Sequence, residues 1–376
     1  CLNRPPGTAA SRAGLRRSRL RRCAPGIWRS FTLRRVSTLK TAIWPESAAL
    51  AGVATGIGSM PGEDVRQAVR TVVDSLDVLP FLPELPERGP GADMIGRSLG
   101  LLVELYAQVE PSGWRFADRP GRDSRRAVSW LREDLDALEE FTQGYSGLLK
   151  IQAAGPWTLA AGVETRNGES ALADPGACRD IAASLAEGLR LHAEEVRRRV
   201  PGAELVVQLD EPSLTAVLDG RVPTASGYRT HRAVDRGVAQ AALREVITAA
   251  GAPVVVHSCA PRVPVELLRR SGASGVSIDF NLLTERDYDE IGEAVEAGMA
   301  LFAGVVPTGD GNLSDPGGTV QGVRQLWRRL GLDPAALGRM VAVTPACGLA
   351  GASPPYARAA LTACVRAAKS LVDNPE

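Results

Sequence analysis

Short apolar runs alternate with longer amphipathic stretches along most of the chain. From residue 54 onward, eight runs of six to eight residues are rich in Val, Ile and Leu and show no clear alternation with polar residues. This pattern is typical of parallel strands that are buried on both faces. Between these runs, apolar residues recur at the three- and four-residue spacing of helices. The predicted strands are 54–60, 78–83, 149–155, 204–210, 253–259, 275–280, 300–306 and 340–347.

The order of these elements predicts the fold class. Eight strand–helix units within about 320 residues favour a single α/β domain, a TIM (β/α)8 barrel, over a doubly wound sheet. Residues 84–147 are long for one connection, so we expect an inserted helical segment after the second strand that forms a flap or lid. Functional groups of such barrels lie at the carboxyl ends of the strands. The helical patterns are 63–76, 124–145, 174–199, 233–250, 284–297, 318–330 and 355–372.

Two strand ends carry residues that bind soft metal ions. The segment VVVHSCAP places His257 and Cys259 two residues apart on the same side of a strand, and Cys347 ends another strand in TPACGLA. A His–Cys–Cys set suits Zn²⁺, and three protein ligands leave a fourth position for substrate, as in catalytic zinc sites. The alternative is that these cysteines are small core residues, which is what we expect of Cys178 and Cys364 within helical patterns.

Two other strand ends carry candidate binding residues. In QLDEP the consecutive carboxylates of Asp210 and Glu211 cannot both face the barrel mouth, so we expect one of them in a supporting position. Asp210 could bind an amine, or the pair could act as acid and base, and the alternative is a capping role before Pro212. The glycines of TGIGSMPG, at 55–62, lack the spacing of a phosphate-binding loop and favour a close backbone approach to a small ligand.

Composition excludes several classes of protein. The chain has 376 residues, 44% of them hydrophobic, but no run of 18 apolar residues, so no membrane span is predicted. Six cysteines are too few for a disulfide scaffold in a chain of this length and favour a reducing, cytoplasmic location. The formal net charge of +1 does not favour a nucleic-acid-binding surface.

The charge is nevertheless unevenly distributed. The first 45 residues contain ten arginines, Lys40 and no acidic residue, which leaves 33 basic and 43 acidic residues in 46–376. We therefore divide the chain into an Arg-rich segment, 1–45, and an acidic catalytic domain, 46–376. The 41 arginines against three lysines indicate a GC-rich bacterial genome, and our preferred hypothesis is an over-extended gene start with Val36 as the initiator. A disordered tail and a basic nucleic-acid-binding arm are the alternatives.

Five motifs resemble segments of a known family. In chain order they are IGSMP (57–61), AGPWT (154–158), QLDEP (208–212), HSC (257–259) and PACGL (345–349). They resemble the segments IGSFP, GPVT, QIDEP, HxC and PDCGL in the carboxyl-terminal catalytic barrel of the cobalamin-independent methionine synthases. The resemblance spans about residues 54–372, and the joint order of the five motifs is more specific than any one of them.

The resemblance implies a zinc-dependent methyltransferase that methylates homocysteine to give methionine. In that family the metal binds the thiol, lowers its pKa and presents it as a thiolate nucleophile. A zinc-side glutamate of the family is matched here by an aspartate, which has one methylene less. Carried over residue by residue, the metal ligands are His257, Cys259, Cys347 and Asp279, the substrate-binding residues are Ile57, Gly58, Ser59 and Asp210, and Asp210 is also the catalytic carboxylate.

The resemblance leaves the methyl donor open. The family's folate-stacking indole falls near Gly162, and its histidine after the seventh strand is replaced within VVPT, at 305–308. Its glutamate after the second strand falls near Gly96, where Glu84 or Asp93 could substitute. The chain is similar to the short, single-barrel forms, so the expected donor is methylcobalamin or a corrinoid protein, or else methyltetrahydrofolate.

Other functions remain open at this point. A corrinoid-dependent methyltransferase for another thiol would use the same zinc chemistry, and a degenerate barrel would bind zinc without catalysis. A decarboxylase of the uroporphyrinogen type shares the barrel but does not need the HxC motif. A glycosidase that uses Asp210 and Glu211 would leave the thiolates unexplained.

Overall fold

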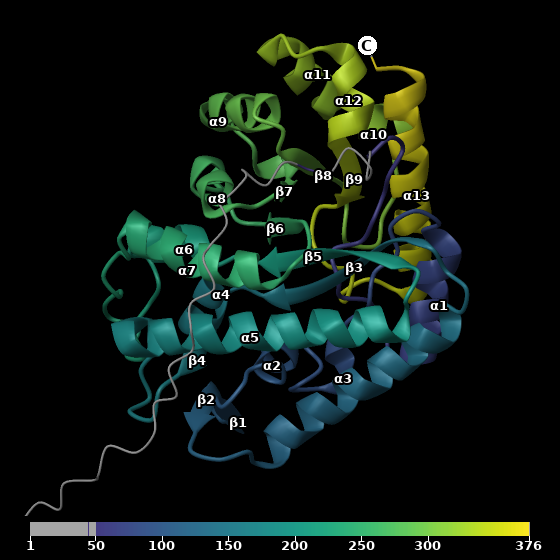
Figure 1. The fold of residues 1–376 in the computed structure, drawn as a ribbon. Coiled ribbons are helices and arrows are strands. Elements are labelled where there is room, and N and C mark those ends of the chain that lie inside the picture. The colour runs from purple at the N-terminus through teal and green to yellow at the C-terminus, as the bar shows by residue number, and fades with distance from the viewer. Residues whose placement is uncertain (1–43, 45–49, 376) are drawn as a thin grey trace, which may run out of the picture. The chain divides into compact units, whose positions relative to one another are not determined.

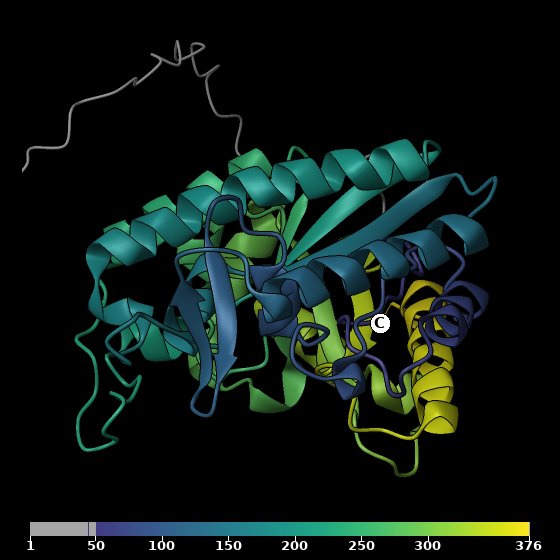
Figure 2. The ribbon, with the colours of Figure 1, turned by 90° about the horizontal axis from the view of Figure 1, so that it is seen from below.

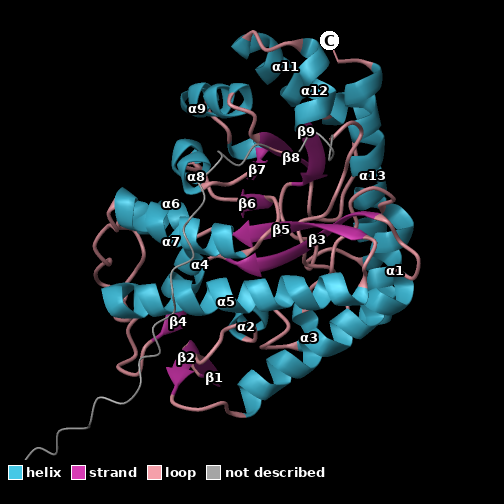
Figure 3. Ribbon diagram, in the orientation of Figure 1, coloured by secondary structure: helices cyan, strands magenta, loops and turns pink. Residues whose placement is uncertain are grey.

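Six parallel strands form the continuous part of the central sheet (Figures 1 and 3). The structure is a computed structural model that describes residue 44 and residues 50–375, so the rest of the Arg-rich segment, with the proposed start at Val36, lies outside the described residues. The strands, in their order across the sheet, are β3 (Gly147–Ala154), β5 (Ala203–Asp210), β6 (Val254–Ser258), β7 (Gly275–Asp279), β8 (Ala300–Val306) and β9 (Val341–Pro345).

Two irregular segments, residues 53–60 and 80–84, close this sheet into a barrel. They correspond to the first two predicted strands, but they form isolated parallel bridges rather than ladders, because Pro80 and Pro83 lack the N–H group that a ladder needs. The (β/α)8 prediction is confirmed. The closing hydrogen bonds run from Thr55 N to Val343 O (3.1 Å), from Met60 N to Glu84 O (2.8 Å) and from Leu82 N to Lys150 O (3.0 Å).

The barrel interior changes from apolar to polar along its axis. Side chains two residues apart on a strand share a face, so Val206, Gln208 and Asp210 of β5 follow one another toward the mouth. Val255 and His257 of β6 do the same. The polar side chains therefore lie toward the mouth, and an apolar base fills the opposite end of the barrel. The members of this base are Trp44, Leu50, Val53, Leu79, Val206, Val255, Ala300, Phe302 and Ala342.

Helices cover the outside of the sheet (Figure 1). The longest, α5 (Pro175–Arg199), begins after Asp174, whose Oδ1 accepts a hydrogen bond from Gly176 N (2.7 Å), and ends with three arginines that favour the carboxyl end of its dipole. Among the described residues, no helix has the length and apolar character that a membrane span requires. The other helices outside the inserted segment are α1 (Val65–Ser75), α4 (Pro156–Gly162), α6 (Leu214–Leu218), α7 (Arg236–Ala249), α8 (Val265–Ser271), α9 (Glu285–Glu296), α10 (Pro316–Thr319), α11 (Gln321–Leu330), α12 (Pro334–Met340) and α13 (Pro354–Asp373).

The segment inserted after the second predicted strand contains helices, as expected, and also a β-hairpin that was not predicted. β1 (Tyr106–Glu110) pairs antiparallel with β2 (Gly113–Ala117), and β2 pairs in parallel with the two-residue strand β4 (Val163–Glu164). Figure 2 shows the hairpin as two neighbouring blue arrows. Only Ala107 and Trp114 of the hairpin are buried, so its hydrophobic pattern is too weak to reveal it. A lid function for this segment stays a prediction.

A buried cluster of ion pairs joins the inserted helices. Asp134 on α3 (Arg122–Phe141) accepts hydrogen bonds from Arg97 of α2 (Met94–Leu99) and from Arg88, and all three side chains are at most 7% exposed. Arg97 also donates to Pro83 O (3.2 Å), which connects this cluster to the second barrel segment. Asp134 therefore balances two cations that have left water.

Removing the Asp134 carboxylate is expected to destabilise the fold. Asp134→Ala would leave Arg97 and Arg88 buried without their shared partner, and the free energy of unfolding in urea should fall by about 3–5 kcal/mol. Asp136→Ala on the same helix is the control, because its side chain is 69% exposed and pairs with Arg199 at the surface. We expect a change below about 1 kcal/mol for the control. Equal losses in the two variants would contradict a special role for the buried cluster.

Candidate metal centre

Three potential metal ligands from distant parts of the sequence lie together at the barrel mouth. His257 belongs to β6, Cys259 follows that strand directly, and Cys347 follows β9. One ligand atom of each residue lies within 4.8 Å of the other two. The barrel thus brings together the three residues that the HxC motif and the PACGL motif contribute.

The imidazole of His257 is oriented for binding a metal ion. Its Nδ1 lies 3.0 Å from Ser277 Oγ on the neighbouring strand β7. Its Nε2 is buried and has no hydrogen-bond partner among the described residues. A buried ring nitrogen without a partner is costly, whereas a metal-binding histidine is commonly held through its other nitrogen in this way. The His257 side chain therefore fits a metal ligand.

The two cysteine sulfurs form a close pair. Their Sγ atoms lie 3.1 Å apart, and both cysteines are free. The hydrogen bond between the sulfurs lowers the pKa of Cys347 and raises that of Cys259, and His257 lowers the pKa of Cys347 further. A bound metal ion would displace the thiol protons of this pair. Cys178 and Cys364 are buried in the core on α5 and α13, as expected.

Asp279 lies outside the ligand group. Its Oδ1 accepts hydrogen bonds from the backbone N and the side-chain Nδ2 of Asn281, both at 2.9 Å, in the turn after β7. The potential ligand group found among the described residues contains only His257, Cys259 and Cys347. The shorter side chain is thus used for a local cap.

The two carboxylates of QLDEP point to different places, as the alternation of side chains requires. Glu211 is fully buried and accepts hydrogen bonds from Trp157 N (2.9 Å) and from the backbone N and hydroxyl of Thr158 (2.9 and 2.8 Å), at the start of α4. Asp210 instead faces the barrel interior, where its Oδ1 accepts a hydrogen bond from Gln208 Nε2 (2.7 Å). Burial raises the pKa of Asp210 to about 6, although His257 and Lys150 act to lower it.

The segment Ile57–Ser59 lies against both halves of the site. A side chain at Gly58 would collide with Gln152, since a Cβ atom there would lie 2.9 Å from its amide nitrogen. A Cβ atom at Gly348, next to Cys347, would lie 2.0 Å from Ser59 Oγ. Ser59 O also accepts a hydrogen bond from Leu349 N (2.9 Å). The glycines thus allow the first barrel segment to approach the loop that carries Cys347.

Several polar residues below the mouth were missed by the sequence analysis. Lys150 Nζ donates to Ile57 O and to Gln208 Oε1, both at 2.8 Å, and Gln152 Nε2 donates to Leu82 O (2.7 Å). The available signal was a pair of polar residues two positions apart in an otherwise apolar strand. It occurs as Lys150 and Gln152 in LKIQA and as Gln208 and Asp210 in VVQLD.

A second carboxylate, Glu84, faces the same interior. It is 3% exposed, and its Oε1 accepts a hydrogen bond from Gln152 Nε2 (3.2 Å). Burial raises its pKa to about 7, with Arg97 acting to lower it and Asp210 to raise it. Asp93, the other candidate substitute near Gly96, caps α2 through the backbone N of Ile95 and Gly96. Of the two candidates, Glu84 is the one that lies near Asp210.

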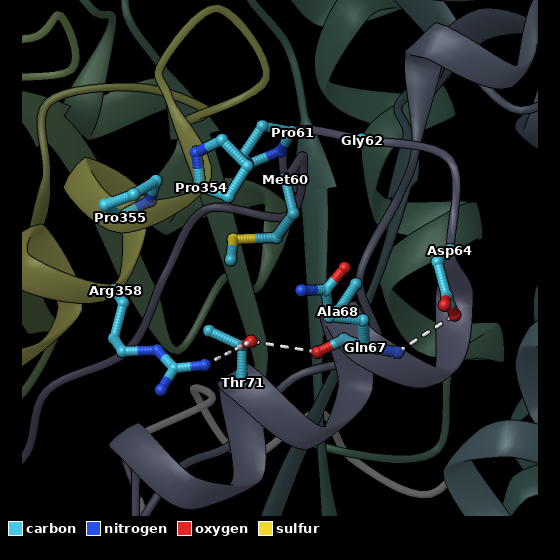
Figure 4. Close-up of a pocket in the computed structure, with 10 residues that line it drawn as sticks. All are labelled: Met60, Pro61, Gly62, Asp64, Gln67, Ala68, Thr71, Pro354, Pro355 and Arg358. Carbon is cyan, nitrogen blue, oxygen red and sulfur yellow. Dashed lines mark hydrogen bonds between the residues drawn. The ribbon is translucent and has the colours of Figure 1, made fainter.

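Two cavities of the molecule are not lined by the residues of the metal centre. One of about 400 Å³ is lined by Met60, Pro61, Pro354 and Arg358, among others, and in it Arg358 Nη2 donates to Thr71 Oγ1 (3.4 Å; Figure 4). The other, of about 910 Å³, lies along α5 and α7. None of the three ligand residues lines either cavity, so the shapes of these cavities give no information about the reaction.

Comparisons with known proteins agree with this architecture. A family model described as the catalytic domain of cobalamin-independent synthase matches residues 53–370. The solved structure of a B12-independent methionine synthase from Shewanella sp. W3-18-1, in complex with selenomethionine, has a TM-score of 0.55 and 12% sequence identity, and the match covers 86% of this chain and 98% of that chain. At that identity the likeness shows the fold alone. No curated protein sequence matches the chain.

The family match covers most of the chain. It includes all five sequence motifs and the three residues of the candidate metal centre. The chain therefore belongs to the family of cobalamin-independent methionine synthases and is a methyltransferase of that family.

Proposed function

We propose that the protein transfers a methyl group to the thiol of homocysteine with the help of a zinc ion. The observation that carries this proposal is the group formed by His257, Cys259 and Cys347, in which Nε2 of the buried histidine has no hydrogen-bond partner in the described part of the chain. One imidazole and two thiolates suit zinc better than the hard cations that prefer oxygen ligands. Three protein ligands leave one position of a tetrahedral site for a substrate sulfur.

Only one step of the proposed reaction, the activation of the substrate thiol, would need the metal ion. Zinc at these ligands would supply an open coordination position at which the substrate thiol loses its proton and is held as a nucleophilic thiolate. The chain's own part is to keep the three ligands converged and His257 oriented through Ser277. We leave Asp279 out of the ligand set, because the group of potential ligand atoms that lie close together among the described residues does not include it.

The amino-acid part of the substrate is proposed to bind beside the metal. Asp210 Oδ1 is held by Gln208, while no described residue donates a hydrogen bond to Oδ2. A substrate ammonium group would give this buried carboxylate the countercharge that the site lacks. Glu84 offers a second acidic group nearby, and the Ile57–Ser59 backbone would position the remaining polar atoms.

The methyl donor is proposed to be methyltetrahydrofolate, bound across the barrel mouth. A corrinoid donor is not supported, since the family is cobalamin-independent. Holding the thiolate and the methyl carbon in line turns an encounter of two molecules into a step within one complex, which accounts for much of the rate expected of such an enzyme.

Donor and acceptor are tested together. Zinc-loaded protein is incubated with L-homocysteine and either methyltetrahydrofolate or methylcobalamin, and methionine is quantified by mass spectrometry. We expect methionine with methyltetrahydrofolate. Product with methylcobalamin alone would overturn the donor assignment, and stoichiometric zinc without transfer from either donor would favour a barrel that binds zinc without catalysis.

Cys347→Ser is expected to abolish both metal binding and transfer. A serine hydroxyl is not deprotonated at neutral pH and is a poor zinc ligand, so the zinc content measured by atomic absorption should fall well below one equivalent. Cys178→Ser is the control, because that thiol lies on α5 and donates to Ala171 O, outside the ligand group, so zinc content and activity should stay unchanged. Full zinc occupancy in Cys347→Ser would count heavily against the centre.

Asp210→Asn is expected to separate substrate binding from metal binding. The amide can still accept the hydrogen bond from Gln208, but the negative charge is lost, so KM for homocysteine should rise roughly 10- to 100-fold. The zinc content should stay at one equivalent. Asp279→Asn serves as the comparison and should change neither quantity. A loss of zinc in Asp210→Asn, or an unchanged KM, would contradict the proposed role.

A further inference from the structure

Lys150 is an unusual residue to find inside a barrel. It lies on β3 with no exposed surface, and it is the one lysine among the described residues that is buried. Its ammonium group donates to Ile57 O and Gln208 Oε1 (2.8 Å each) and lies 5.2 Å from the centre of the Phe81 ring. No carboxylate among the described residues pairs with it directly, so neutral oxygens and an aromatic face hold the cation.

The contact with Lys150 determines which way the Gln208 amide points. An ammonium group can only donate hydrogen bonds, so the amide must turn its oxygen toward Lys150 and its NH₂ group the other way. The NH₂ group then donates to Ile57 O and to Asp210 Oδ1, both at 2.7 Å. The reversed amide would place NH₂ against the ammonium group and an oxygen against the carboxylate.

Lys150, Ile57 O, the Gln208 amide and Asp210 form one hydrogen-bond network. Both lone pairs of Ile57 O are used, by Lys150 and by Gln208, and both N–H bonds of the Gln208 amide are used. The network therefore fixes Asp210 relative to the Ile57–Ser59 segment. These are the two parts of the site proposed to hold the amino acid.

We propose that Lys150 is a positioning residue that acts through the Gln208 amide to hold Asp210 in place for the ammonium group of the substrate. This inference rests on the proposed function and names a residue that supports the same site. Lys150 does not contact the substrate. Its removal should affect thiol substrates that carry an amino group and spare those that do not.

The test compares two thiols that differ by one group. L-homocysteine and 4-mercaptobutanoate share the thiol and the carboxylate, but only the former carries an ammonium group. Binding of each to the zinc-loaded protein is measured by titration calorimetry for the wild type and for Lys150→Met, which keeps the length of the side chain. We expect the Kd for L-homocysteine to rise about tenfold, with the Kd for 4-mercaptobutanoate and the zinc content unchanged.

Two further variants separate positioning from folding. Lys369→Met removes a lysine that is exposed on α13 and should change neither Kd. Gln208→Met breaks the same link at its second residue, so it should also weaken L-homocysteine selectively, and it provides the test if Lys150→Met does not fold.

The outcomes distinguish this inference from the proposed function. Equal weakening of both thiols in Lys150→Met, or no weakening of either, would overturn the positioning role while the wild type still prefers L-homocysteine. A wild-type protein that does not distinguish the two thiols would overturn the proposed role of Asp210, and the inference with it.

Discussion

Charged and polar side chains that are buried inside the barrel must form hydrogen bonds or ion pairs with one another. This requirement determines how the polar side chains near the barrel mouth are arranged. Lys150, Gln208, Asp210 and Glu84 all point into the same space, from which water is largely excluded. Burial is the largest influence on the pKa of each ionisable member: it raises those of Asp210 and Glu84 and lowers that of Lys150 to about 7. Hydrogen bonds among these residues, such as those from Lys150 and Gln208, offset part of the cost of burying them.

The same requirement explains the division of the barrel into an apolar base and a polar mouth. In the apolar base, the ring centroids of Phe302 and Trp44 lie 5.5 Å apart. The side chains of the base need no hydrogen bonds and fill the interior by close packing. Polar side chains begin one step higher on β5 with Gln208, on β6 with His257 and on β9 with Thr344, where the open end can admit a ligand that completes their bonding. No described residue donates a hydrogen bond to Asp210 Oδ2 there, so a cationic ligand could pair with this oxygen.

Features of the fold and of the site that depend on a single strand could be predicted from the sequence. The positions of eight strand-like segments, the shared face of His257 and Cys259, and the opposite facing of Asp210 and Glu211 all follow from periodicity. The Lys150–Gln208 contact does not, because it depends on the register between β3 and β5, which pairs Lys150 with Val206 and Gln152 with Gln208. The hairpin at 106–117 was invisible because few of its side chains are buried, and the role of Glu211 became clear only with the three donors of α4.

The groups that prepare the site also close the barrel. Residues 53–60 and 80–84 form only isolated bridges, so several of their carbonyl groups lack ladder partners. Side chains from β3 and β5 supply the missing donors: Lys150 and Gln208 reach Ile57 O, and Gln152 reaches Leu82 O. Irregular backbone is tolerated at this seam because polar side chains replace the ladder. The irregularity in turn leaves the Ile57–Ser59 segment close to Cys347, where a regular strand would continue its pairing. The side chains that close the barrel at this seam are therefore also the ones that surround Asp210.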